Sequence, residues 1–118
     1  MRVIYENEVK GMGEMVEAFE GMFVLFGDNA PDTLKDFCYV ITVKDAEDTI
    51  QAGQTLEIDG VGYEILGVGD VVQKNLESLG HISVSFTGDV ENGLPGSLVL
   101  PACDVPKLKI GSVIRILA

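Results

Sequence analysis

The stretch TLEIDGVGYEILGV, residues 55–68, decides the fold class of this chain. Two runs with alternating apolar side chains, 55–58 and 61–68, flank the dipeptide Asp59-Gly60. Asp-Gly favours a two-residue hairpin turn, because both of its residues tolerate the positive φ that such a turn requires. The sequence therefore predicts a β-hairpin here.

Short runs of the same kind surround this hairpin. A chain with 14 glycines does not suit a helical bundle, whereas it suits many short strands separated by turns. The convincing helical segment is 71–79, where Val72, Leu76 and Leu79 recur at helical spacing and Gly80 follows as the C-terminal cap. Pro31 opens one possible further turn at 31–35. These patterns predict an all-β fold, a small closed or nearly closed barrel with one short helix. The further predicted strands are 2–10, 22–26, 38–44, 81–86, 97–100 and 113–117.

Length and charge limit what the chain can do. Its 118 residues, 12.7 kDa, predict a single domain over 1–118. A net charge of -11, from 8 Lys and Arg against 19 Asp and Glu, and the lack of a basic stripe argue against a nucleic-acid partner. The same charge argues against binding to anionic membranes. The same charge suits a basic protein partner.

The sequence has no apolar signal-peptide core and no run of apolar residues long enough to span a bilayer. We therefore expect a cytoplasmic protein in which Cys38 and Cys103 are reduced thiols. Two cysteines and one histidine do not make up a standard zinc site, so neither a metal nor a cofactor is expected.

His81 is the only histidine and the first candidate for chemistry. It shares strand parity with Ser83 and Ser85, whereas the residues between them are apolar. A neutral imidazole on this polar face would be a nucleophile and a good phosphoryl acceptor near neutral pH. The alternative is that His81 only caps the helix end or hydrogen-bonds a turn carbonyl.

The other candidates are weaker. Neither cysteine has a nearby Lys or His to lower its thiol pKa, so a cysteine-based redox protein is the less favoured class. The pairs Gly60/Gly62 and Gly67/Gly69 superficially resemble nucleotide loops, but they lack the Lys and the βαβ context and fit hairpins and bulges better.

Residues 75–86, NLESLGHISVSF, resemble the glucitol/sorbitol-specific enzyme IIA component of the bacterial phosphotransferase system. The resemblance covers nearly the whole chain, and it implies a six-stranded barrel and a phosphate relay. In that relay, the carrier HPr donates phosphate to a histidine of enzyme IIA, which passes it to the IIB unit of the membrane permease. The other matching positions are Val3-Ile4-Tyr5, Ala30-Pro31, Leu34, Cys38, Gly53, Leu56, Tyr63, Val68-Gly69, Pro95-Gly96 and Gly111-Ser112-Val113.

The chain departs from this family at the acceptor position. The resemblance places the acceptor three residues after Cys38, where the sequence has Ile41, on the apolar parity of its strand. Two hypotheses follow. In the first, His81 is the acceptor, with Gly80, Ser83 and Ser85 near the phosphate, and the partners are HPr and the IIB/IIC permease. In the second, the chain has lost phosphotransfer and is a protein-binding or regulatory module.

Overall fold

The computed structural model describes residues 2–118, and in it the strands form two separate sheets. The first sheet has the order β1-β10-β5-β6, and the second has the order β2-β4-β3-β8-β9-β7. The strands are β1 (Val3–Glu8), β2 (Gly11–Met12), β3 (Met22–Gly27), β4 (Tyr39–Ile41), β5 (Thr55–Ile58), β6 (Val61–Glu64), β7 (Gly67–Val68), β8 (Ile82–Ser85), β9 (Ser97–Val99) and β10 (Val113–Leu117).

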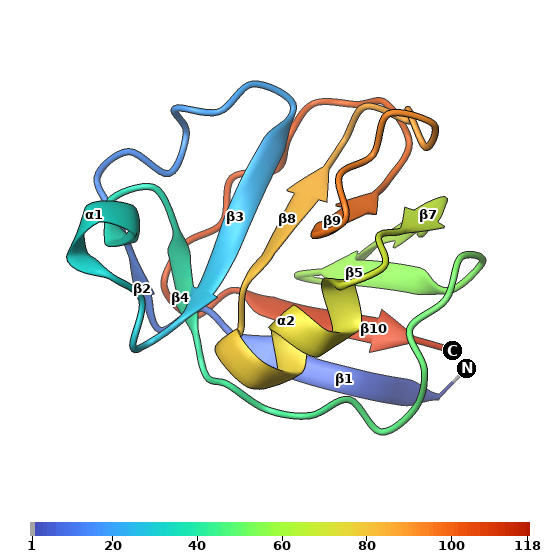
Figure 1. The fold of residues 1–118 in the computed structure, drawn as a ribbon, viewed down its shortest axis with the longest axis horizontal. Coiled ribbons are helices and arrows are strands. Elements are labelled where there is room, and N and C mark those ends of the chain that lie inside the picture. Colours follow the sequence, from blue (N-terminus) through green and yellow to red (C-terminus); the bar gives the residue numbers. More distant parts are fainter. Residues whose placement is uncertain (1) are drawn as a thin grey trace.

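The closed six-stranded barrel with one helix is wrong. Within residues 2–118, the edges of the first sheet, β1 and β6, do not pair with the edges of the second, β2 and β7. The same residues form two helices, α1 (Asp32–Lys35) and α2 (Val72–Leu79). Alternating apolar side chains indicate which residues form strands. They do not indicate which strands pair, because pairing partners can be distant in the sequence, and the sequence therefore did not show that the sheets stay open. The strands of one sheet run across those of the other, with α2 beside them (Figure 1).

The main core lies between the sheets and takes side chains from both, and α2 contributes Val72 and Leu76, as its spacing predicted. The third residue of that predicted apolar face, Leu79, is exposed instead. The predicted hairpin is confirmed: Ile58 pairs with Val61 across a turn in which Asp59 and Gly60 have positive φ.

The predicted strand 38–44 ends early, at Ile41, for a reason visible in the structure. The buried side chain of Asn7 in β1 binds both backbone groups of Thr42: Nδ2 donates to the carbonyl at 2.7 Å, and Oδ1 accepts from the N–H at 3.2 Å. A side chain therefore replaces the next rung of the β-ladder. This contact also joins the first sheet to the end of β4 in the second sheet.

Neither α1 nor α2, the helices of residues 2–118, has the length and apolar character that crossing a membrane requires. Within the same residues, no three His, Cys, Asp or Glu side chains gather closely enough to hold a metal ion.

Candidate functional site

His81 lies at the junction between α2 and β8, where a glycine turns the chain. Gly80 ends the helix in the left-handed conformation, with φ of 68°, and its N–H donates to the Leu76 carbonyl at 3.0 Å. A Cβ at this position would lie 2.9 Å from the backbone nitrogen of Gly27. Only glycine therefore allows the helix end to approach β3 this closely, which brings His81 against the same strand.

Two neighbours in β3 fix the orientation of the His81 ring. Its Nδ1 lies 3.2 Å from the backbone carbonyl oxygen of Leu25, and the ring stacks on Phe26 with centroids 4.2 Å apart and planes 26° apart. A carbonyl oxygen only accepts hydrogen bonds, so in the neutral ring Nδ1 carries the proton. The lone pair is then on Nε2, which has no hydrogen-bond partner within residues 2–118.

The side chain of His81 is half-buried, neither sealed in the core nor fully exposed. The sequence also allowed a structural role for His81, a hydrogen bond to a turn carbonyl. The ring does bond a carbonyl, but this is the carbonyl of Leu25, which belongs to strand β3 and not to a turn. This contact occupies one ring nitrogen and leaves the other available. His81 can therefore support the structure through Nδ1 and still offer Nε2 as a nucleophile.

The two serines follow His81 along the outward face of β8. Ser83 and Ser85 are half-buried and alternate with the buried residues Ile82 and Val84. With a rise of about 3.3 Å per residue, Ser83 is about 7 Å along the strand from His81, and Ser85 is about 13 Å along it. The Ser85 hydroxyl lies 3.2 Å from that of Thr87. Ser83 is therefore the nearer of the two hydroxyls to the imidazole.

Ile41 packs in the core, which confirms the parity argument: its side chain is fully buried. Position 41 is nevertheless close to the candidate site, because Cγ1 of Ile41 is 3.5 Å from the point where a Cβ of Gly80 would lie. Residue 41 and His81 are distant in the sequence, but they flank the same junction. No pattern in the sequence indicates this proximity or the contacts of His81 with Leu25 and Phe26.

The cysteines do not form a reactive pair. Cys38 is buried, and burial raises the pKa of its thiol, which disfavours the reactive thiolate. Cys103 is a free and exposed thiol.

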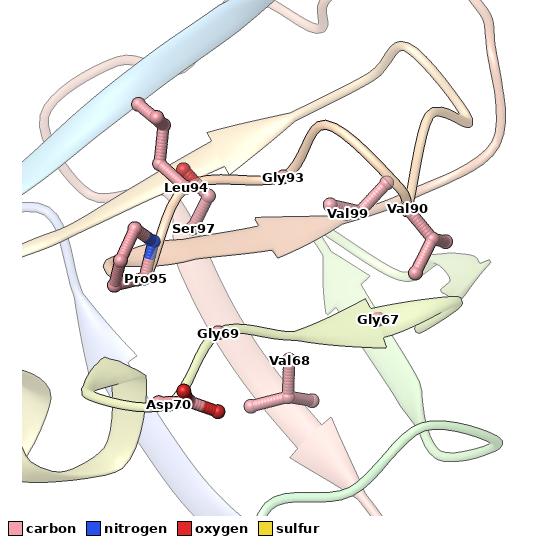
Figure 2. A pocket seen from close by; sticks show the side chains of 10 residues that line it. All are labelled: Gly67, Val68, Gly69, Asp70, Val90, Gly93, Leu94, Pro95, Ser97 and Val99. Carbon is pink, nitrogen blue, oxygen red and sulfur yellow. The ribbon is translucent and has the colours of Figure 1, made fainter.

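A pocket of about 220 Å³ lies beside β7 and includes the second glycine pair, Gly67 and Gly69 (Figure 2). A Cβ on Gly69 would collide with the carbonyl oxygens of Leu94 and Pro95, so this glycine permits close backbone approach. The lining includes the carboxylate of Asp70 but no Lys, Arg or His, and therefore offers no cation for a phosphate. This agrees with the interpretation that these glycines belong to hairpins and bulges and not to a nucleotide loop.

Comparison with known proteins identifies the family. The family model described as "PTS system glucitol/sorbitol-specific IIA component" matches residues 4–115, and the chain belongs to this family. It is 26% identical over 117 residues to the PTS system glucitol/sorbitol-specific EIIA components of Escherichia coli and of Shigella flexneri, covering 98% of this chain and 95% of each relative.

A solved structure is also similar. The crystal structure of the PTS system IIA component from Enterococcus faecalis has a TM-score of 0.85 and 28% identity, covering 97% of this chain and all of that one. The chain is therefore an enzyme IIA of the phosphotransferase system, a class of protein that acts in sugar transport. This confirms the family that the sequence resembled.

Proposed function

We propose that this chain is a phosphoryl relay in sugar uptake and that His81 is its acceptor. In this proposal, phosphorylated HPr donates the group and the IIB unit of a glucitol/sorbitol permease receives it. The observation that carries the proposal is the orientation of the imidazole: Nδ1 is held by the Leu25 carbonyl, whereas Nε2 has no partner within residues 2–118.

The chemistry needs few groups. The Nε2 lone pair attacks the phosphorus of the donor phosphohistidine, so that one N–P bond forms as the donor's N–P bond breaks. The proton on Nδ1 stays in its hydrogen bond, and the Leu25 carbonyl dipole stabilises the positive charge of the phosphorylated ring. In the second step, the cysteine thiolate of the IIB unit attacks the same phosphorus, and His81 leaves as the neutral imidazole. Positioning supplies most of the catalysis in such a transfer.

In this proposal, three residues near the imidazole surround the phosphoryl group. Gly80 is buried against Gly27, and its close packing on β3 holds the imidazole in position beside the phosphoryl group. Ser83 offers the nearest hydroxyl on the outward face, and Ser85 offers a second hydroxyl further along β8. All three belong to the proposal together with His81.

The second candidate function is a binding or regulatory module without phosphotransfer. The observation in its favour is Ile41, a fully buried aliphatic residue at the position where the family resemblance places the acceptor histidine. The two candidates differ in one measurable property, the formation of a phosphohistidine.

Intact-mass spectrometry separates the two candidates. The protein is incubated with phosphoenolpyruvate, enzyme I and HPr, and we expect a single phosphate adduct that is labile in acid and stable in base. The adduct should be absent from His81→Ala and present in Cys103→Ser, an exposed control position, with circular dichroism verifying that both variants fold. Absence of an adduct in the wild type would favour the binding module. Persistence in His81→Ala would show that another residue is the acceptor.

A further inference from the structure

A groove of about 360 Å³ lies at the β2 edge of the six-stranded sheet, outside the site described above. The side chains of Met12, Glu14, Lys35, Asp36 and Val40 line it, and we call it the β2 groove. Its two walls are joined by backbone hydrogen bonds, from the Gly13 N–H to the Cys38 carbonyl and from the Met15 N–H to the Asp36 carbonyl. The groove is therefore a defined surface between the 11–15 segment and the end of α1.

The β2 groove and His81 lie on the same face of the sheet. Val40 is paired with Phe26 in the parallel ladder of β3 and β4, and Phe26 stacks on His81. The residues next to these, Tyr39 and Leu25, face the core instead. Neighbouring strands are about 4.8 Å apart, so Val40 is about 10 Å from the strand that begins beside His81.

The groove is apolar with an acidic surround. Met12, which lines the groove, is 42% exposed. Met15 and Leu34, each next to a lining residue in the sequence, are 49% and 42% exposed. Residues 11–40 contain one basic residue, Lys35, which lies 3.9 Å from Asp32. The same segment contains six exposed acidic residues, Glu14, Glu17, Glu20, Asp28, Asp32 and Asp36. Of these, Glu14 and Asp36 line the groove, whereas Glu17 pairs with Lys107 at 3.4 Å.

We propose that the β2 groove is the docking surface for the protein that gives His81 its phosphoryl group, a partner with an apolar contact surface bordered by basic side chains. This inference rests on the proposed function for its choice of partner. A standard interface covers about 800 Å² on each protein, which is a patch that extends about 16 Å from its centre. A partner protein centred on His81 therefore also covers Val40 and the groove.

Charge determines the kind of occupant. A basic partner is attracted to the acidic surround, whereas a second copy of this chain would bring two acidic surfaces together. Met12 and Val40 in the groove supply the apolar contact that such an interface requires at its centre, and the exposed Met15 and Leu34 adjoin it in the sequence. Two of the acidic residues, Glu14 and Asp36, therefore lie in the groove beside Met12 and Val40.

The test is a binding titration with unphosphorylated HPr from the same organism, measured by calorimetry at low and at high ionic strength. The groove variant Glu14→Lys/Asp36→Lys reverses two exposed charges, and Glu64→Lys/Asp104→Lys makes the same charge change at exposed positions elsewhere. We expect the groove variant to bind at least about tenfold more weakly and the control within about twofold of wild type, with the difference shrinking at high salt.

The outcomes separate this inference from the proposed function. Binding by His81→Gln at wild-type affinity, lost on charge reversal in the groove, would support the docking surface even if no phosphate adduct forms. Unchanged affinity of the groove variant, equal weakening of the control, or no binding of HPr by the wild type would overturn it. A dimer of the chain alone in sedimentation, abolished by Glu14→Lys/Asp36→Lys, would make a second copy the occupant and would also overturn it.

Discussion

At the scale of single residues, the tautomer of His81 decides which nitrogen is available for chemistry. The Leu25 carbonyl accepts a hydrogen bond from Nδ1, so we expect the neutral ring to carry its proton there and to leave Nε2 unprotonated. Nitrogen chemical shifts of the labelled imidazole, measured by long-range correlation NMR, distinguish the two tautomers. A ring protonated at Nε2 would contradict the observed contact and would remove the nucleophile that the proposed relay needs.

Ile41 is the second residue on which the interpretation depends. Because its side chain is fully buried, Ile41→His places a polar ring in the core, and we expect the free energy of unfolding to fall by about 2 kcal/mol or more. Urea unfolding measures this loss. Ile110→His is the matched control, since Ile110 is 62% exposed and the same change there should stay within about 0.5 kcal/mol. If Ile41→His lowered the free energy of unfolding as little as Ile110→His does, position 41 would tolerate a histidine.

At the scale of elements, the close approach of the α2 terminus to β3 depends on Gly80. Gly80→Ala adds a Cβ against the backbone of Gly27 and also strains a positive φ, so we expect a loss of about 2 kcal/mol or more. Gly111 also has a positive φ, of 97°, but nothing lies within 4 Å of its Cβ position. Gly111→Ala should therefore cost only about 1 kcal/mol. Thermal unfolding compares the two, and equal losses would mean that crowding at Gly80 contributes nothing.

The elements that the sequence predicts well are those whose determinants are local. Asp59-Gly60 specifies its own turn, and Gly80 ends the helix that begins at Val72. The predicted strand 38–44 was too long because its end depends on Asn7, a side chain from another strand that takes over the backbone groups of Thr42. No pattern within 38–44 contains that information.

At the scale of the whole molecule, the sequence predicted the all-β composition but not the division into two open sheets. The order β2-β4-β3-β8-β9-β7 mixes parallel and antiparallel pairs between segments that are far apart in the chain. The candidate site shows the same limit. His81 could be selected as the only histidine, whereas its stacking on Phe26 and its proximity to Ile41 arise from strand pairing and from the packing of Gly80 on β3.

The stability of the whole molecule in alkali should reflect a tyrosine in the main core. Burial raises the pKa of Tyr5 to about 12, although the hydrogen bond from Asn7 lowers it. An unfolded tyrosine ionises near pH 10, so between about pH 10 and 12 the unfolded chain releases a proton that the folded protein retains. The stabilisation is complete below this window and is lost as the pH rises through it, by about 2 to 3 kcal/mol.

Urea unfolding across that window measures the loss, and Tyr5→Phe should remove most of the Tyr5 contribution while leaving those of Tyr39 and Tyr63. Burial raises the pKa of both other phenols as well, but Tyr63 is only partly buried. Tyr63→Phe is therefore the control, and it should change the pH dependence less than Tyr5→Phe does. If the free energy of unfolding had the same pH dependence in wild type and in Tyr5→Phe, the Tyr5 phenol would ionise alike in the folded and unfolded states. That result would contradict the raised pKa that we expect from its burial between the sheets.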